Sequence, residues 1–523
     1  MWENLFDFHC SASSCLEIDT SPPALRSITL DTDSDTGHLG DWRTETALVD
    51  LVGRTEAFAT VAIGDVTTTA DRRGRFELED VHLDLGTDEY LITLTDRVGN
   101  TTTSMIEATR LTNSAVRWNE VALEAIKDTS TAPMYATRLL AMESVAVYDV
   151  LNAIEHDTLY FTDLDRPARG KINTEAAIAQ AAYDVLTSIY ASDSGPYAGS
   201  AALRENLQAE LSASLAEIPD GGAEQRGLRL GHDIARSILA QRAGDGWDDV
   251  VDPQTEIGTD PGEWRPTPTG FANPLAPNWG DVTPWAVESA QQFMPEAPPT
   301  LTSNEYAAAY NETKELGAAN SEQRGLRTAD QTQIALFWAD GAGTYTPPGH
   351  WNNIAGEVLQ AEGRTTAEIA GLFAELNVAL ADAAITCWEA KYTYDLWRPV
   401  TAINLGDLDG NPLTVADPSW RSLIATPPFP EYPSGHSTFS PAAAAILTAE
   451  FGDNYGFTTG TSSPDPTIAG VTRSFSSFTE AAEEAGRSRI YGGIHFDFAN
   501  QNGLESGRQI AEWVLVRFAG LRA

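Results

Sequence analysis

Cysteine is scarce in this sequence: Cys10, Cys15 and Cys387 are the three cysteines among 523 residues. Cys10 and Cys15 could pair with each other and would leave Cys387 alone, so no framework of disulfides is expected. The Cys-x-x-Cys spacing of structural zinc sites is absent as well. These absences exclude the small disulfide-stapled folds and the common zinc folds.

Positive charge is also scarce. The chain has 33 Lys and Arg against 75 Asp and Glu, which gives a formal net charge of −42. A surface this acidic repels nucleic acid and anionic membranes, so neither is expected as a partner. No uninterrupted apolar run of roughly 18 residues exists, so membrane insertion is not expected either. The first residues lack a charged segment followed by an apolar one, so no signal peptide is visible.

The length of 523 residues and the apolar fraction of 42% predict at least two folded domains. We interpret residues 1–21 as a leader or linker. From 22 to 112, short alternating runs such as "FATVAIG" and "EYLITLTD" are separated by turn signals such as "DRRG" and "RVGN". This pattern predicts a β-sandwich. The segment resembles the bacterial immunoglobulin-like domains of large surface and secreted proteins, which implies an extracellular or cell-surface protein.

Residues 113–523 have the pattern of helices. Apolar residues recur every three or four positions, with small residues between them, in runs such as "TEAAIAQAAYDVLTSIY". This spacing predicts a closely packed helical bundle, so the chain as a whole is expected to be mainly α. A loop rich in Pro, Gly and Trp at 244–299 is interpreted as a functional lid or a wrapping segment. Helices are expected again from 303 to 400, near 478–489 and near 501–517.

Three short segments of the helical region carry charged and nucleophilic side chains: "KYTYDLWRP", "YPSGH" and "SRIYGGIH". Their candidate site residues are Lys391, Arg398, Ser434, Gly435, His436, Arg489 and His495. If the segments meet, two guanidinium groups and an ammonium group surround one point, together with a hydroxyl, a backbone N–H and two imidazoles. Such a set of charged donors binds a tetrahedral oxyanion. Gly435 precedes an expected helix start, where an anion is also favoured.

In order and spacing, these segments match Lys-x6-Arg-Pro, Pro-Ser-Gly-His and Ser-Arg-x5-His. The chain thereby resembles the superfamily of vanadium haloperoxidases and phosphatidic-acid-type phosphatases, and residues 114–523 resemble its soluble bacterial branch. The resemblance implies vanadate as cofactor, with phosphate able to occupy the same site. It implies that His495 is the covalent ligand of vanadium, or the nucleophile towards phosphate, and that His436 is the acid–base group. Lys391 is implied to bind the oxyanion and to polarise bound peroxide. The other implied oxyanion-binding residues are Arg398, Ser434, Gly435 and Arg489.

Further positions bear on the resemblance. Trp388 and Phe429 match pocket residues of the chloroperoxidase type. The family usually has Asp four residues after the last histidine, where this chain has Ala499, with Asp497 two residues earlier, so a supporting contact of the site is expected to be lost or rerouted. Asp340 in "FWADG" is a candidate carboxylate for orienting His436 or Arg489. His350 in "PPGHW" is either a core histidine or part of the site.

Three functions are weighed. The first is vanadate-dependent oxidation of halide by hydrogen peroxide to hypohalous acid, which then reacts with a small organic acceptor. The second is an acid phosphatase that acts through a phosphohistidine in the same pocket. The third is a surface-associated binding protein with a degenerate site. Separately, each motif residue has an ordinary explanation. Arg398 could pair with Asp395, Arg489 could pair with Glu484, and Lys391 could be a solvated helix residue.

Overall fold

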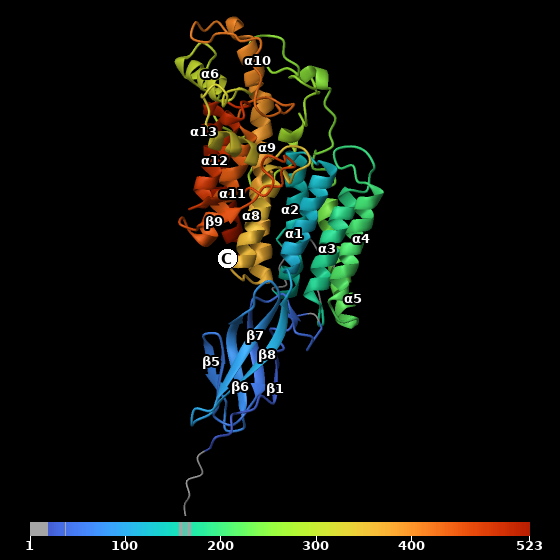
Figure 1. Ribbon diagram of the computed structural model, residues 1–523. Helices are drawn as coiled ribbons and strands as arrows, with labels where there is room; N and C mark the ends of the chain where they lie inside the picture. The colour runs from blue at the N-terminus through green and yellow to red at the C-terminus, as the bar shows by residue number, and fades with distance from the viewer. Residues whose placement is uncertain (1–18, 37, 156–159, 163, 165–168, 523) are drawn as a thin grey trace, which may run out of the picture. The chain divides into compact units, whose positions relative to one another are not determined.

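The computed structural model describes residues 19–36, 38–155, 160–162, 164 and 169–522 (Figure 1). The chain divides into two units, Met1–Leu111 and Thr112–Ala523. Residues 1–18 of the expected leader, with Cys10 and Cys15, lie outside the described residues, so their possible pairing stays a prediction. Among the described residues Cys387 is the free cysteine, and it is buried.

The N-terminal unit is made of strands, as the alternating runs predict. They are β1 (Ser27–Leu30), β2 (Arg43–Thr44), β3 (Leu48–Arg54), β4 (Thr60–Ile63), β5 (Val66–Thr69), β6 (Arg75–His82), β7 (Gly86–Thr95) and β8 (Thr101–Arg110). They form a three-stranded sheet in the order β1-β3-β6 and a five-stranded sheet in the order β2-β8-β7-β4-β5. Inward side chains of both sheets, such as Leu51 and Leu94, share one buried cluster. The immunoglobulin-like sandwich itself stays a prediction.

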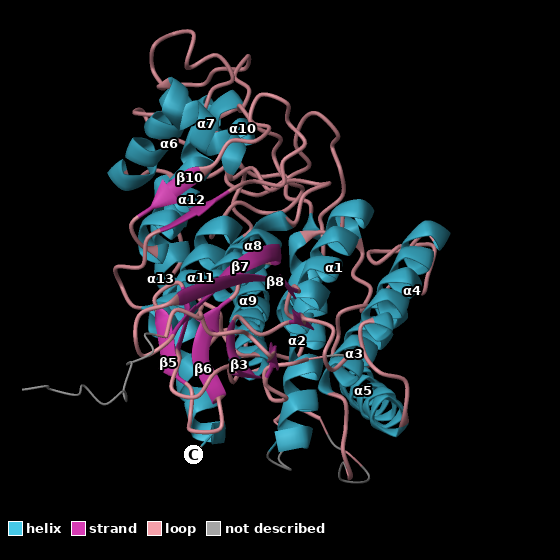
Figure 2. Ribbon diagram, turned by 60° about the horizontal axis from the view of Figure 1, so that its bottom comes forward, coloured by secondary structure: helices cyan, strands magenta, loops and turns pink. Residues whose placement is uncertain are grey.

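The C-terminal unit is helical, which confirms the expected class. Its helices are α1 (Ser114–Thr129), α2 (Pro133–Glu155), α3 (Thr174–Ile189), α4 (Ala201–Ala216), α5 (Gly222–Gln241), α6 (Asn304–Leu316), α7 (Ala329–Phe337), α8 (Thr346–Ala361), α9 (Thr366–Tyr394), α10 (Pro399–Asn404), α11 (Gly435–Phe451), α12 (Phe478–Tyr491) and α13 (Asp497–Arg522). Three short 3-10 helices accompany them: η1 (Pro253–Glu256), η2 (Trp279–Asp281) and η3 (Gly406–Leu408). A short antiparallel pair, β9 (Phe457–Thr459) and β10 (Arg473–Phe475), was not expected. Long irregular segments surround α6, α7 and α10, as Figure 2 shows.

Helix α9 forms the centre of this unit and packs against α2, α11 and α13 (Figure 1). It begins with a capping box, in which Thr365 accepts from the Glu368 N–H and the Glu368 side chain accepts from the Thr365 N–H. By length and mean hydropathy, α9 could cross a membrane, but its apolar window is completely buried inside the unit. The sequence analysis expected helices here but no membrane-like segment, because Glu375 and Asp382 interrupt the apolar run of this helix. Complete burial is the property of a core helix.

The three motif segments lie at helix ends. Lys391 is in the last turn of α9, His436 is in the first turn of α11, and Arg489 is in the last turn of α12. Arg398 immediately precedes α10, and His495 lies two residues before α13. Side chains at helix ends can point along the helix axes into one space, so this arrangement lets distant segments build one site.

Candidate active site

The Arg-Pro pair of the first motif has a local structural reason. Pro399 is the first residue of α10, a position that proline favours, and it keeps Arg398 in an extended conformation with φ −73° and ψ 154°. The Arg398 side chain is completely buried. Its Nε donates to the Phe429 carbonyl at 2.7 Å, and its Nη1 donates to the Ile494 carbonyl at 3.0 Å. Nη1 also lies 3.0 Å from Nε2 of His495, so the first and third motifs meet here.

Lys391 is also completely buried. Its ammonium group donates to the carbonyls of Pro430 and Glu431, each at 3.1 Å, and to the carbonyl of Pro433. Burial lowers the pKa of Lys391 to about 8, and the nearby Arg398 charge lowers it as well. Because its three donors contact backbone oxygens of the segment before His436, Lys391 fixes this segment. Its charge also makes the pocket more positive. The solvated-lysine explanation is therefore wrong.

His495 and Arg489 come from the third motif, where α12 ends in a glycine turn. Gly493 has φ 76°, and a Cβ there would lie 2.3 Å from the Gly317 carbonyl oxygen, so only glycine fits. The turn brings His495 back beside Arg489, which donates from Nη1 to the Trp338 carbonyl at 2.6 Å. Burial lowers the pKa of His495 well below its ordinary value, as do the charges of the two arginines and the lysine. Burial likewise lowers the pKa of Arg489 to about 9.

A buried carboxylate links His436 to a second histidine. Asp340 Oδ2 lies 3.9 Å from His436 Nε2, and Asp340 Oδ1 lies 3.2 Å from His350 Nδ1. The second ring nitrogen of His350 contacts the Gly460 carbonyl at 2.9 Å. Asp340 has φ 43°, a left-handed conformation that costs energy in a non-glycine residue and is concentrated at functional sites. Asp340 therefore faces His436, as the sequence suggested, and His350 is its main partner.

The two ring nitrogens of His350 both face hydrogen-bond acceptors, which indicates a doubly protonated imidazolium. Burial opposes this charge, but Asp340 outweighs it and raises the pKa of His350 above its ordinary value. The reverse holds for His436, because burial and Arg489 lower its pKa well below the ordinary value. One carboxylate thus lies between a charged and a neutral histidine.

Glu431 was not identified in the sequence. It is completely buried, and its Oε1 lies 3.0 Å from His495 Nδ1 and accepts from the Phe496 N–H at 2.8 Å. Burial raises the pKa of Glu431 to about 7, although the Phe496 N–H and the charges of Arg398 and Lys391 oppose the rise. The available signals were an acidic residue inside "FPEYPSGH" and the alanine at 499. Asp497, the nearer acidic residue in sequence, pairs with Arg487 at 2.9 Å.

Ser434 and Gly435 form the start of α11. Ser434 is the N-cap, and its hydroxyl oxygen accepts from the Ser437 N–H at 3.4 Å. Gly435 is the first helical residue, so its N–H belongs to the turn that has no intrahelical acceptor. A Cβ on Gly435 would meet Phe439 and Trp388 only at ordinary contact distances of 3.6 and 3.9 Å. A close backbone approach within the protein is therefore not the reason for this glycine.

Trp388 and Phe429 form one wall beside the charged groups. Their ring centroids are 4.9 Å apart. The Lys391 ammonium lies 5.1 Å from the Phe429 ring centroid, and the Arg398 guanidinium lies 4.7 Å from it. The Phe429 ring thus packs against both cations, an arrangement that favours them electrostatically.

A separate aromatic cluster supports the site. Trp397, Tyr432 and Phe496 are buried together with Tyr306, and the indole N–H of Trp397 donates to the Tyr306 hydroxyl at 3.0 Å. Trp397 directly precedes Arg398, and Phe496 directly follows His495. Tyr432 lies two residues before Ser434. The cluster therefore anchors the three motif segments to one another.

The ordinary pairings suggested for the arginines do not form among the described residues. Glu484 pairs with Arg473, at 2.7 Å, and accepts from the Trp338 indole N–H. Arg398 contacts carbonyl groups and His495 instead of Asp395. Both guanidinium groups are therefore free of a carboxylate hydrogen bond and keep their positive charge for the pocket.

Three buried donor atoms of motif residues have no hydrogen-bond partner within the described part of the chain: Arg398 Nη2, Arg489 Nε and His436 Nε2. Unsatisfied buried polar atoms are costly in folded proteins, and these three belong to neighbouring side chains, since the charge of Arg398 acts on Arg489 and that of Arg489 acts on His436. A tetrahedral oxyanion would accept from the two guanidinium nitrogens, and from His436 Nε2 when that nitrogen carries the proton. The residues present therefore fit vanadate or phosphate.

Comparison with known proteins agrees with this geometry. Residues 371–521, which contain all three motifs, match the family model of the VCPO second helical-bundle domain. The chain is 28% identical over 411 residues to vanadium chloroperoxidase of Curvularia inaequalis, and the match covers 66% of each protein. The chain is thus similar to vanadium haloperoxidases. The chain spans about two thirds of the length of that curated relative.

Solved structures of bacterial vanadium-dependent peroxidases are similar to this chain as well. The crystal structure of the first bacterial vanadium-dependent iodoperoxidase matches with a TM-score of 0.65 and 28% identity, over 77% of this chain and 95% of that one. Apo- and holo-type bacterial vanadium-dependent chloroperoxidases match with TM-scores of 0.57 and 0.56, at 15% and 16% identity. These two cover 75% of this chain and 94% and 93% of theirs, and they show the common fold alone.

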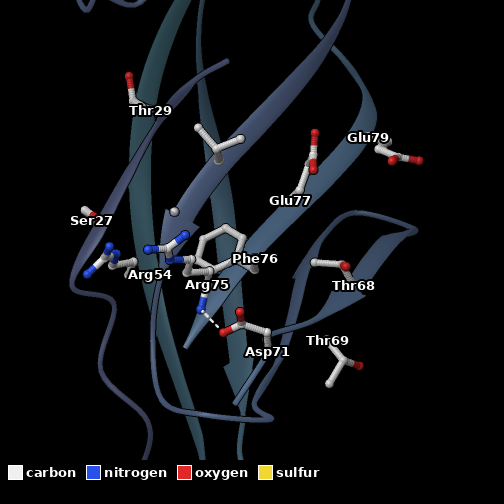
Figure 3. A pocket seen from close by; sticks show the side chains of 12 residues that line it. Ser27, Thr29, Arg54, Thr68, Thr69, Asp71, Arg75, Phe76, Glu77 and Glu79 are labelled. Atoms are coloured by element: carbon white, nitrogen blue, oxygen red, sulfur yellow. Dashed lines mark hydrogen bonds between the residues drawn. The ribbon is translucent and has the colours of Figure 1, made fainter. Parts of the chain in front are cut away.

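An open pocket of about 750 Å³ also lies in the N-terminal unit, where Figure 3 shows its lining. Arg54, Arg75, Glu77 and Glu79 place both signs of charge around it. The Arg75 N–H donates to Asp71 at 2.9 Å. None of the motif residues lines this pocket, so it is distinct from the oxyanion site of the haloperoxidase-like unit.

Proposed function

We propose that the haloperoxidase-like unit binds vanadate and oxidises halide with hydrogen peroxide to hypohalous acid, which reacts with a small organic acceptor. The observation that carries the proposal is the group of unpartnered buried donors from Arg398, Arg489 and His436 beside His495. Similarity to vanadium-dependent relatives supports the choice of vanadate as the bound oxyanion. Phosphate is the natural competitor for the same donors.

In this proposal each side chain has a defined task. Arg398 and Arg489 neutralise the oxyanion and donate hydrogen bonds to it, helped by the Ser434 hydroxyl and the Gly435 N–H. Lys391 adds positive charge to the pocket while its ammonium group contacts the backbone carbonyls of the second motif segment. His495 offers its Nε2 as the ligand of vanadium. Bound vanadate supplies a Lewis acid at which hydrogen peroxide becomes reactive towards halide.

His436 is suited to moving a proton at the pocket. Its Nε2 has no hydrogen-bond partner among the described residues and lies 3.9 Å from Asp340, and its lowered pKa keeps the ring neutral at neutral pH. A neutral imidazole can take a proton from an incoming hydroxyl group and return it to a leaving one. Asp340 would stabilise the charged ring that forms between these two steps.

The test uses the full chain. Purified protein is incubated with orthovanadate, and bromination or iodination of a phenolic dye is followed with and without hydrogen peroxide. We expect turnover that requires vanadate, peroxide and halide together, and that phosphate suppresses by competition. Robust phosphatase activity that vanadate merely inhibits, without halide oxidation at any mildly acidic to neutral pH, would replace this proposal with the phosphohistidine reaction at His495.

A further inference from the structure

Glu431 and His495 come from different motif segments and form a buried contact. Glu431 Oε1 lies 3.0 Å from His495 Nδ1 and accepts from the neighbouring Phe496 N–H at 2.8 Å. The backbone of Glu431 is held as well, because its N–H donates to the Leu396 carbonyl at 2.8 Å and its carbonyl accepts from Lys391 at 3.1 Å. The backbone of Glu431 is thus fixed on both sides and Oε1 has two partners, while Oε2 has no hydrogen-bond partner among the described residues.

The contacts of His495 determine where its ring proton lies. A guanidinium N–H can only donate, so Nε2 of His495 accepts from Arg398 Nη1 at 3.0 Å. The other ring nitrogen, Nδ1, lies 3.0 Å from an acceptor, Glu431 Oε1. The single proton therefore lies on Nδ1 and is donated to Glu431 Oε1. Nε2 keeps its lone pair directed towards the arginine and the pocket.

We infer that Glu431 is the positioning residue of His495: it holds the Nδ1–H tautomer and the ring orientation in which Nε2 is unprotonated and directed towards the pocket. A histidine that binds a metal commonly donates its other N–H to a carboxylate for this purpose. The carboxylate comes from the segment that leads into α11, whereas the first turn of α13 carries the buried Ala499. The inference rests on the proposed function for the identity of the oxyanion, but the tautomer does not depend on it.

Other acidic side chains near His495 do not serve this role. Asp497 lies two residues after His495, yet its carboxylate pairs with Arg487 at 2.9 Å and accepts from Asn500. Asp340 faces His350 and His436. Glu431 is therefore the carboxylate that contacts the ring within the described residues.

The decisive experiment relocates the carboxylate. Glu431→Ala removes it, Glu431→Gln keeps its shape and an oxygen acceptor, and the double variant E431A/A499D supplies it from the first turn of α13. A499D alone is the matched control. Two quantities are measured on each folded protein: the ring ¹⁵N chemical shifts of His495, assigned by their loss in His495→Ala, and the dissociation constant for orthovanadate.

We expect wild-type shifts of a protonated Nδ1 and an unprotonated Nε2 in the vanadate-free protein. E431A should mix the two tautomers and weaken vanadate binding by roughly 10- to 100-fold, the usual effect of removing the partner of a metal-binding histidine. E431Q should keep the Nδ1–H tautomer and lose less affinity. E431A/A499D should recover both the tautomer and part of the affinity, whereas A499D alone should leave them at the wild-type level.

Unchanged shifts and unchanged vanadate affinity in E431A would overturn the inference, and so would an Nε2–H tautomer in the wild type. A loss in E431A that A499D fails to restore would overturn the claim that the carboxylate has moved between elements. If E431A does not fold, E431Q decides, because a wild-type tautomer with reduced affinity supports the inference and a changed tautomer contradicts it. Absence of halide oxidation would reject the proposed function while leaving these measurements valid.

Discussion

Nη1 of Arg398 lies 3.0 Å from Nε2 of His495, so a permanent donor faces the ring nitrogen that is proposed to bind vanadium. The same guanidinium has an unpartnered Nη2. Arg398 therefore prepares the pocket in two ways: it keeps Nε2 unprotonated, and it offers a free donor and full charge to an oxyanion.

Replacing Arg398 by Ala should weaken orthovanadate binding by roughly 10- to 100-fold, because a charge-assisted hydrogen bond contributes about 1.5 to 3 kcal/mol. Arg398→Lys should recover only part of the affinity, since an ammonium group cannot make the forked contacts of a guanidinium. Isothermal titration with orthovanadate measures both changes. Arg487→Lys is the control, because Arg487 pairs with Glu312 and Asp497. Equal affinity of wild type and R398A would reject this role.

Replacing His495 and replacing His436 should have different effects on vanadate binding and on turnover. His495→Ala should abolish halide oxidation and strongly weaken vanadate binding, because it removes the proposed ligand. His436→Ala should keep vanadate bound through the cationic side chains but lower turnover by roughly 100- to 10,000-fold, the usual contribution of an acid–base group. Vanadate affinity and steady-state rates are compared for both variants. Loss of binding in H436A together with intact binding in H495A would reverse the assignment.

Oxyanion affinity should fall as pH rises through about 8, because burial lowers the pKa of Lys391 to about 8 and its charge is present only below that value. Tungstate is the suitable probe, since it stays a tetrahedral dianion at the neutral to alkaline pH where Lys391 changes charge. Lys391→Arg should move the fall to higher pH, and Lys391→Met should give weak binding without a step near that pH. A wild-type affinity that is constant across this range would contradict the prediction.

His350 should stabilise the helical unit in a pH-dependent way. Asp340 raises the pKa of His350 in the folded protein against the opposing effect of burial. A raised folded-state pKa stabilises fully below the unfolded value of about 6.5 and loses this effect as pH rises through the folded value. His350→Gln should therefore lower the free energy of unfolding most at low pH, by about 3 to 5 kcal/mol, as breaking a buried ion pair does.

Urea unfolding of the helical unit at several pH values, followed by tryptophan fluorescence, measures this difference. His232→Gln provides the control, because the side chain of His232 is 62% exposed where it pairs with Asp184. A difference between wild type and H350Q that grows with rising pH would have the wrong sign and would exclude a charged His350.

The N-terminal unit should be dispensable for catalysis. All motif residues belong to Thr112–Ala523, and the division falls after Leu111. A chain that begins at residue 112 should bind orthovanadate and oxidise halide at the rate of the full chain. Circular dichroism first establishes that the helices remain folded. Loss of activity in a folded, truncated chain would assign a catalytic contribution to the strands.

Much of the fold follows from sequence periodicity. The alternating runs before residue 112 form strands, and the three- and four-residue spacing after it forms helices such as α2 and α3. These patterns are local, so they predict the elements well. They did not predict the membrane-like hydropathy of α9, because Asp382 interrupts its apolar run. They also did not predict the β9–β10 pair, because three-residue strands are too short to show a period.

The sequence by itself determined which residues of the motifs belong together, since Lys391, Arg398, His436, Arg489 and His495 stand in one recognisable order. Only the tertiary structure decided their partners. Glu431 contacts His495 across 64 positions of sequence, and His350 pairs with Asp340, which in turn faces His436. A spacing rule can specify residues on one helix end, but contacts between different helix ends depend on how those helices pack, and packing is not encoded in any local pattern.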